Sequence, residues 1–268
     1  MIRNLMVFRR LVLLNVMSAA EYRGGFFIYM TEAVIVPVIS LLVWLTVGEQ
    51  AGGHLPYSRS QLITYYLLLS IVSMLTGTWF GRFVAQNIRQ GEFSAWLLRP
   101  ISYLPFYAAN NVGNKLGKLP LLLPIVAVAG LAFWRGLHLP MDPRAWLLFL
   151  ASLTMAATLS FLIDFVIGSL AFWIQDVDGL IRAKVLIGSF LAGQFIPLAL
   201  FPPGFEGFLE AQPFRYTLSF PLEIITGSLS TAELATGFAW QAGYCVLFYV
   251  CYHVVWWRGL PSYSAWEA

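Results

Sequence analysis

Residues with the types and spacing for catalytic or metal chemistry are few in this chain. Its three histidines, His54, His138 and His253, are far apart, and none has a second histidine, a cysteine or paired carboxylates at metal-ligand spacing. The two cysteines, Cys245 and Cys251, fall on different faces of a helix, which predicts neither a disulfide nor a metal site. We therefore expect no catalytic centre, no metal and no cofactor in this chain.

The nearest approach to a nucleotide-binding loop is the sequence GNKLGK at residues 113–118. Its glycines and lysines do not have the Gly-x4-Gly-Lys-Ser/Thr spacing, and Leu119 stands where a hydroxyl would hold Mg²⁺. The stretch is more typical of a basic anchor at the start of a membrane span. A process that uses ATP would therefore need a separate ATP-binding subunit.

Two acidic residues, Glu32 and Asp164, lie inside strongly apolar stretches. A charge at the centre of a bilayer costs about 2.5–3.5 kcal/mol on insertion scales, so each side chain should face protein or water. Each has two interpretations: a polar point or proton carrier on a transport pathway, or a partner in an interhelical hydrogen bond. Glu32 could also lie shallow enough to reach the interface. Gln194, flanked by Gly193 and Pro197, is a milder case of the same kind.

A short charged segment, residues 86–100, separates two long apolar stretches. Pro100 ends any helix at or before the preceding residue, and the segment is too short and too charged to cross a membrane. Its apolar residues have the i, i+3, i+4 spacing of one helical face, and its charged residues supply polar contacts. The apolar residues are Phe93, Trp96 and Leu97, and the charged ones are Arg89, Glu92 and Arg99. The pattern fits either an ordinary interfacial loop helix or a docking element that a partner protein moves.

The composition is that of a membrane protein. Of 268 residues, 59% are hydrophobic and only 11% are charged, whereas soluble domains have about a quarter charged residues. A helix needs about 20 mostly apolar residues to cross a bilayer. Six stretches qualify: 25–47, 62–84, 116–134, 146–174, 183–200 and 237–257. We therefore predict one all-α transmembrane domain over residues 1–268, with six spans.

Two segments outside these spans should also be helical. Residues 1–22 predict an imperfect amphipathic helix on the membrane surface. Its polar side is formed by Arg3, Asn4, Arg10, Asn15, Ser18 and Glu21. Residues 201–230 have apolar side chains at near-helical spacing, interrupted by prolines. They predict either two short helices dipping into the outer leaflet or an outer-surface loop with amphipathic turns.

The basic residues set the orientation. Of the sixteen lysines and arginines, only Arg59, Arg135, Arg144 and Arg215 fall outside when the N-terminus is placed inside. The positive-inside rule therefore predicts that both termini are cytoplasmic, in the cell (inner) membrane.

Together these features resemble the permease subunits of type-2 ABC exporters, in particular those described as antibiotic or daunorubicin-type export proteins. Four strings carry the resemblance: Glu21-Tyr22-Arg23; Ile88 to Glu92 with Leu97 to Pro100; Gly193 to Leu198 with Phe201-Pro202; and Pro213 to Tyr216 with Pro221 and Gly227. The resemblance covers nearly the whole chain.

The resemblance implies a role for each segment. Residues 86–100 would be the coupling helix that sits in a cleft of a separate ATPase subunit, and residues 1–22 the connecting helix near it. Spans one, two and five would line the dimer interface and the pathway, and residues 201–230 would form the outer gate. Expected partners are two ATPase subunits that bind ATP and Mg²⁺, a second copy of this permease or a related one, and membrane lipid, but not nucleic acid. The expected substrate is amphipathic, either lipid-like or drug-like.

The alternative is a proton-coupled secondary transporter that uses Glu32 and Asp164 as carriers. The chain has no visible inverted repeat and only two candidate acids, which favours the ABC permease. A membrane-embedded enzyme would need a catalytic constellation that the sequence does not contain. Dependence of transport on ATP or on a proton gradient separates the first two hypotheses.

Overall fold

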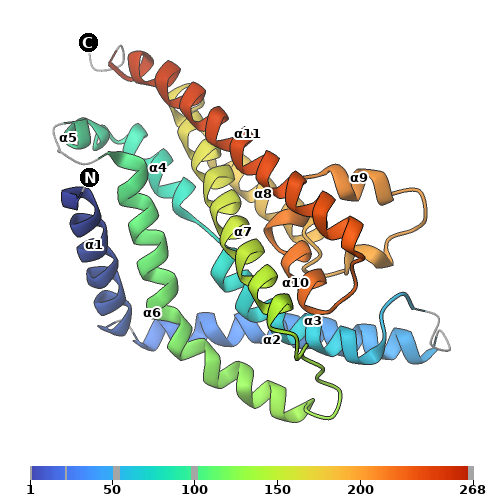
Figure 1. Ribbon diagram of the computed structural model, residues 1–268. Helices are drawn as coiled ribbons and strands as arrows, with labels where there is room; N and C mark the ends of the chain where they lie inside the picture. The colour runs from blue at the N-terminus through green and yellow to red at the C-terminus, as the bar shows by residue number, and fades with distance from the viewer. Residues whose placement is uncertain (1, 22, 51–54, 98–101, 265–268) are drawn as a thin grey trace.

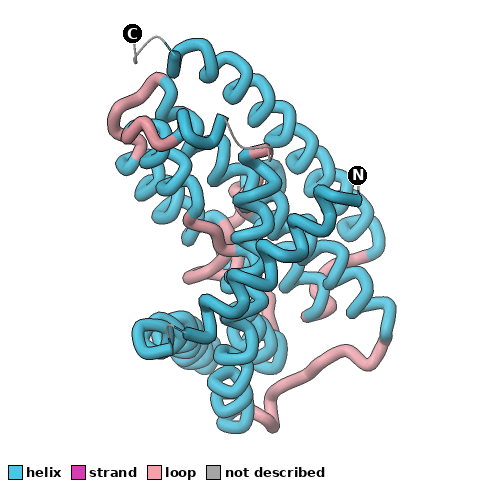
Figure 2. Tube along the Cα trace, turned by 90° about the vertical axis from the view of Figure 1, so that its left-hand side faces the viewer, coloured by secondary structure: helices cyan, strands magenta, loops and turns pink. Residues whose placement is uncertain are grey.

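The computed structural model describes residues 2–21, 23–50, 55–97 and 102–264, and only the backbone of residues 2–5, 19–21, 23–32, 95, 97 and 264. All regular structure in these residues is helical (Figures 1 and 2). The α-helices are α1 Ile2–Glu21, α2 Arg23–Gln50, α3 Arg59–Thr76, α4 Phe80–Arg89, α5 Phe93–Leu97, α6 Tyr103–Ala132, α7 Pro143–Ser169, α8 Asp178–Leu191, α9 Glu206–Ala211, α10 Ser219–Ile225 and α11 Thr231–Ser264. The 3-10 turns are η1 Leu170–Phe172, η2 Leu198–Leu200 and η3 Arg215–Thr217.

Helix starts follow from local capping. Ser58 and Gln61 form a capping box at α3, because each side chain accepts a hydrogen bond from the other's backbone N–H. At α7, the Asp142 carboxylate accepts a hydrogen bond from the backbone of Arg144, and Pro143 occupies the first helical position. These caps fix where two of the long apolar helices begin.

Five described segments are long and apolar enough to cross a membrane: Ala33–Gln50, Arg59–Arg89, Tyr103–Ala132, Pro143–Phe172 and Thr231–Tyr263. They correspond to the predicted spans one to four and six. The second is broken between Gly77 and Trp79, where α3 ends and α4 begins. The all-α fold class is thus confirmed.

The predicted fifth span, residues 183–200, does not form one long helix. The helix there, α8, has 14 residues, so it is about 21 Å long and falls short of a hydrocarbon core of about 30 Å. The chain leaves the helix at Ala192 and continues through Gly193 and Pro197 to the short turn η2. Glycine and proline both disfavour a continuing helix, which explains the interruption.

Helix α7 is central to the arrangement. It packs against α3, α4, α10 and α11, while α6 packs against α1, α2 and α3. In Figure 1, α7 and α11 run side by side, and α2 and α3 lie across the lower part of the view. The start of α1, α5 and the end of α11 lie toward the upper left, whereas α9 and α10 lie on the right. Segments predicted to be cytoplasmic therefore gather at one end of the molecule.

The first helix confirms the helical prediction for residues 1–22 over its described part. On its predicted polar side, Arg10 and Ser18 are exposed, whereas Asn15 contacts a neighbouring helix. The Asn15 amide donates to Asn110 Oδ1 of α6 at 2.6 Å, so this polar residue faces a neighbouring helix. A Cβ on Gly113 would lie 2.6 Å from Asn15 Cβ, so the two helices are in close contact. The exposed residues of α1 include Leu14 and Met17. Helix α1 therefore has an apolar outer side as well as a polar contact with α6.

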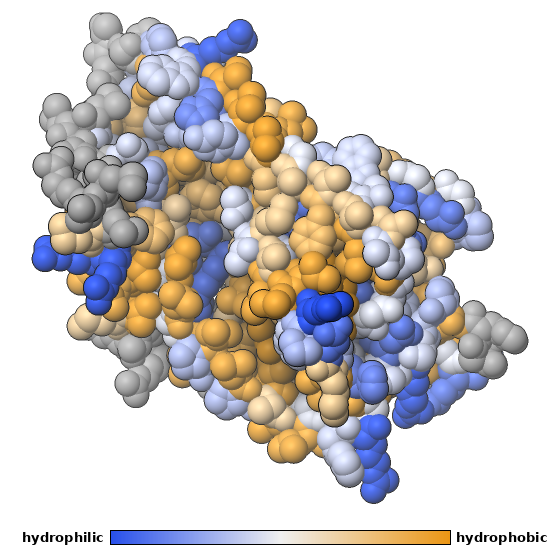
Figure 3. All heavy atoms as spheres, in the orientation of Figure 1, coloured by the Kyte–Doolittle hydropathy of each residue, from blue (hydrophilic) through white to orange (hydrophobic). Residues whose placement is uncertain are grey.

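Large apolar side chains are exposed along the outside of the long helices. Figure 3 shows a broad apolar area on the face formed by α6, α7 and α11. Exposed apolar residues of these three helices include Val128, Leu131, Leu147, Val246 and Val250. An apolar surface of this extent is expected on a protein that contacts lipid.

Candidate functional site

A cavity of about 680 Å³ lies between α2, α3, α7, α8 and residues 214–218. Apolar side chains form most of its wall, and hydroxyl groups and two lysines add polar points. Its polar lining residues are Ser73, Thr76, Thr78, Lys118, Ser160, Lys184, Ser189, Gln194 and Thr217. The cavity is therefore amphipathic, and Gln194 is the predicted pathway residue that lines it.

Asp164 lies next to this cavity, with 1% of its surface exposed. Its Oδ1 accepts a hydrogen bond from Lys184 Nζ of α8 at 2.8 Å. Its Oδ2 accepts from the backbone N–H of Gly81 at 2.7 Å and from the Thr78 hydroxyl at 3.3 Å. These bonds join Asp164 to neighbouring helices, and its role as a polar point or proton carrier on a pathway stays a prediction.

The break between α3 and α4 explains the position of this carboxylate. Trp79, the residue before α4, makes no side-chain capping bond, so the first N–H groups of α4 need another acceptor. Asp164 supplies it from α7, where a negative charge is also stabilised by the helix N-terminus. Asp164 therefore joins α7, α8 and the start of α4.

The α4–α7 contact is backbone to backbone. A Cβ on Gly168 would lie 2.4 Å from the Gly81 carbonyl oxygen, and one on Gly81 would lie 2.4 Å from the Asp164 carbonyl oxygen. The sequence has Gly77 and Gly81 at Gly-x3-Gly spacing, which indicates close helix packing. This is correct for Gly81, whereas Gly77 ends α3 instead.

Lys115 of α6 is buried, and its Nζ has no hydrogen-bond partner among the residues described. It lies one helical turn from Lys118, which lines the cavity. The sequence predicts that Lys115 and Lys118 form a basic anchor at the start of span three, and all three lysines, Lys184 included, count as cytoplasmic charges that set the orientation. Because these lysines lie in or next to apolar stretches of the sequence, they could have indicated a polar site among the apolar helices.

The other acid predicted for the pathway is Glu32. Its side chain lies outside the described part of the structure. Among the side chains that are described, no three His, Cys, Asp or Glu residues come together as a metal site would require.

The chain beyond α8 is held by aromatic residues of two neighbouring helices. Tyr65 of α3 donates its hydroxyl to the Gly193 carbonyl at 2.8 Å. The Tyr66 hydroxyl and the Trp44 indole N–H both donate to the Phe195 carbonyl at 2.9 Å. Carbonyls freed by the helix break thus find partners inside the protein.

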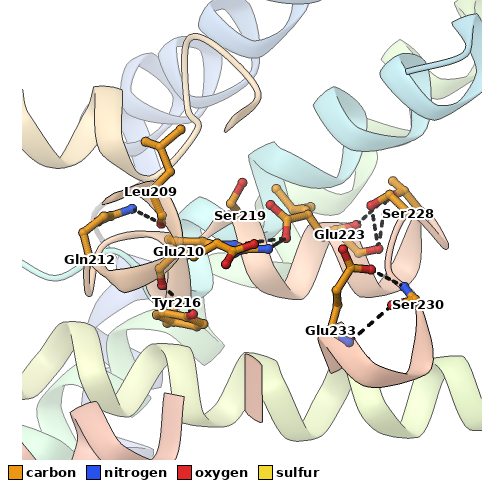
Figure 4. Close-up of polar contacts among 12 residues, drawn as sticks. Leu209, Glu210, Gln212, Tyr216, Ser219, Glu223, Ser228, Ser230 and Glu233 are labelled. Atoms are coloured by element: carbon orange, nitrogen blue, oxygen red, sulfur yellow. Dashed lines mark hydrogen bonds and ion pairs between the residues drawn. The ribbon is translucent and has the colours of Figure 1, made fainter. Parts of the chain in front are cut away.

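The predicted outer segment contains two short helices, α9 and α10, and α10 packs against α7 and α3. Arg215 pairs with Glu223 at 2.8 Å, and both side chains are largely buried (Figure 4). Burial lowers the pKa of Arg215 and the Glu223 carboxylate raises it, with a net rise. Gln212 donates to the Leu191 carbonyl at 2.8 Å and ties this segment to α8. Whether these helices enter the outer leaflet stays a prediction.

The segment 86–100 forms the end of α4, a turn at Gly91 and the short helix α5. Gly91 has a positive φ of 76°, which allows the reversal. Phe93 is 1% exposed and packs among aromatic rings whose centroids lie 5.2–5.9 Å away. These rings belong to Tyr103, Phe172, Trp256 and Tyr263. Phe93 therefore anchors the segment to its own chain.

The other predicted docking residues lie in different surroundings. Trp96 packs on Phe106 with a centroid distance of 4.3 Å, and Glu92 is exposed at the turn. Arg89 donates to the Gln175 carbonyl at 2.7 Å and so contacts the loop before α8. The side chain of Leu97 and the whole of Arg99 lie outside the described residues.

Residues 34–266 match the family model described as "ABC-2 family transporter protein". A search of curated proteins gives no match.

Proposed function

Because the chain belongs to the ABC-2 family of transporter proteins, we propose that it is the membrane permease subunit of an ATP-driven exporter. The observation that carries the proposal is the amphipathic cavity beside the α3–α4 break, on the same stretch of chain as the segment 86–100. Its mixed lining suits a lipid-like or drug-like substrate, which has an apolar body and a polar group.

The chain crosses the cell (inner) membrane six times, with both termini in the cytoplasm. Helix α7 ends toward the end of the molecule where α5 lies, and α11 begins near α9 and α10 (Figure 1). The intervening chain must therefore travel between the two ends, through α8 and residues 192–200. Irregular backbone at that depth is acceptable because protein groups satisfy its carbonyls.

The segment 86–100 is the docking site for an ATPase subunit. Exposed Glu92 supplies polar contacts, to which Arg99 further along the sequence adds, while Phe93 and Trp96 hold the segment against the permease. Two ATPase subunits bind ATP and Mg²⁺ and dock on two permeases, which are copies of this chain or a related one. Closure of the ATPase subunits moves the docking segments, and rigid helices pass the motion to the cavity and the outer segment.

Purification of the tagged protein from its native membranes in mild detergent tests this function. Mass spectrometry should identify a co-purified ATP-binding subunit that is lost when Glu92→Arg reverses the exposed charge. Glu206→Arg, an equally exposed charge reversal on α9, should retain it. The proposal fails if no ATP-binding subunit co-purifies, or if Glu92→Arg leaves assembly and transport-coupled ATP hydrolysis unchanged.

A further inference from the structure

Asp178, the first residue of α8, is held by two arginines of α4. Its Oδ1 lies 3.2 Å from Arg82 Nε, and its Oδ2 lies 3.4 Å from Arg89 Nη2. Arg89 also donates to the Gln175 carbonyl in the loop that leads into α8. Bonds to two arginines in a shared network restrain a carboxylate more than a single exposed pair would.

A second ionic link joins the same two helices further along. Lys184 of α8 pairs with Asp164, and the other oxygen of Asp164 accepts the Gly81 N–H at the start of α4. Six residues of helix separate Asp178 from Lys184, which is about 9 Å. The first two turns of α8 are therefore connected to α4 near both of its ends.

Packing between these links is apolar but small. Val177 and Ile181 are buried with Ala85 of α4, and Ile167 of α7 and Ala171 of η1 pack against this cluster. The opposite side of α8 carries exposed apolar residues such as Leu186 and Ile187. Within this chain, α8 is therefore held by α4 together with α7.

The far part of α8 forms cavity wall. Val185, Gly188 and Ser189 line the cavity, followed by Ala192 and Gln194. Helix α3 is a poorer route for motion, because the non-helical residues 77–79 separate it from α4. The rigid path from the segment 86–100 to the cavity runs through α4 and then α8.

We propose that Asp178 is a positioning residue that makes α8 follow α4, so that movement of the docking segment reaches the cavity wall through α8. That an ATPase moves the docking segment rests on the proposed function, whereas the link between α4 and α8 does not depend on it. The charge of Asp178 is the required property, since it must attract Arg82 and Arg89 together.

Spin-label distances in the purified chain test the link directly. With both native cysteines changed to serine, labels are placed at the exposed positions Gln86 of α4 and Leu186 of α8. In lipid nanodiscs, Asp178→Asn should broaden or shift the distance distribution, and Asp178→Glu, which keeps the charge, should restore it. Asp176→Asn is the matched control, because among the described residues this neighbouring carboxylate accepts only from the backbone N–H of Asp178. An unchanged distribution in Asp178→Asn would overturn the proposal.

The co-purified ATPase gives a second, separable readout. Asp178→Asn should keep the bound ATPase and its basal ATP hydrolysis but lose the substrate-stimulated increase, which Asp178→Glu should retain. A full stimulated rate in Asp178→Asn would exclude the role in transmission. Absence of any ATPase would refute the proposed function, whereas the distance measurement would still decide the link between α4 and α8.

Discussion

Asp164 shows how one buried carboxylate organises three elements. It receives hydrogen bonds from Lys184 on α8, from the backbone of Gly81 on α4 and from Thr78 in the turn between α3 and α4. A buried charge is tolerated only when such partners compensate for its lost hydration. In the proposed transporter, this residue keeps the cavity wall attached to the helix that leads to the docking segment.

Asp164→Asn should therefore be strongly destabilising. The substitution leaves the Lys184 ammonium largely buried without a counter-charge, and breaking such a pair costs about 3–5 kcal/mol. Thermal unfolding in detergent should show a clear drop in midpoint, and the double variant Asp164→Asn with Lys184→Met should recover part of it. An unchanged midpoint in the single variant would contradict this account of the pair.

The sequence identified Asp164 as a residue that needs a partner, but not which partner. A carboxylate in an apolar stretch needs a polar or charged partner, and the sequence around Asp164 is enough to show this need. Lys184 lies twenty residues away on a different helix, and helical periodicity does not pair residues between helices. The link between Arg89 and Asp178 was missed for the same reason.

At the scale of elements, local contacts stabilise the break in the helix after α8. Gly193 has a positive φ of 81°, and a Cβ there would lie 2.7 Å from both Tyr65 Oη and Ser219 Oγ. Gly193→Ala should thus lower the stability of the protein for two reasons. Its backbone would be strained by about 1–2 kcal/mol, and its Cβ would displace the Tyr65 hydroxyl. Thermal unfolding of the purified chain measures the combined loss.

Gly227→Ala is the matched control for this prediction. Gly227 also has a positive φ, of 68°, but no atom lies within 4 Å of the position that its Cβ would occupy. Gly227→Ala should therefore lose only the stability that backbone strain costs. When Tyr65→Phe removes the hydroxyl, the losses of stability in Gly193→Ala and Gly227→Ala should become more similar. Equal losses at both glycines would mean that Tyr65 does not hold the break.

The place where this element ends was only partly predictable. The Pro202-Pro203-Gly204 stretch gives a strong stop signal, whereas the helix already ends at Leu191. A lone glycine within an apolar run does not by itself predict a break, since glycine is common in membrane helices. The break is stable because Tyr65, Tyr66 and Trp44 satisfy the exposed carbonyls, and those residues come from distant parts of the sequence.

At the scale of the whole molecule, composition and span length were sufficient for the all-α membrane class and for five of the long apolar helices. They could not show that α1 packs along α6 through Asn15, because the amphipathic pattern assigns every polar residue to the outside. Family membership then supplies the link between this fold and transport.

The proposed topology predicts opposite accessibility for two exposed positions. In a cysteine-free background, Met141→Cys lies in the α6–α7 loop, where Met141 is 99% exposed. It should react with a membrane-impermeant maleimide on intact cells. Glu92→Cys, at the turn before α5, should react only after the membrane is permeabilised. The reverse labelling pattern would show that the orientation predicted from the basic residues is wrong.

In the proposed function, ATP hydrolysis by a docked subunit drives outward transport through this chain. The most direct measurement is uptake of a fluorescent amphipathic probe by inside-out membrane vesicles that contain the chain and its ATPase. The account predicts uptake that requires ATP and Mg²⁺, persists when a protonophore removes the proton gradient, and is lost with Glu92→Arg. Uptake that needs no ATP and collapses with the proton gradient would contradict it.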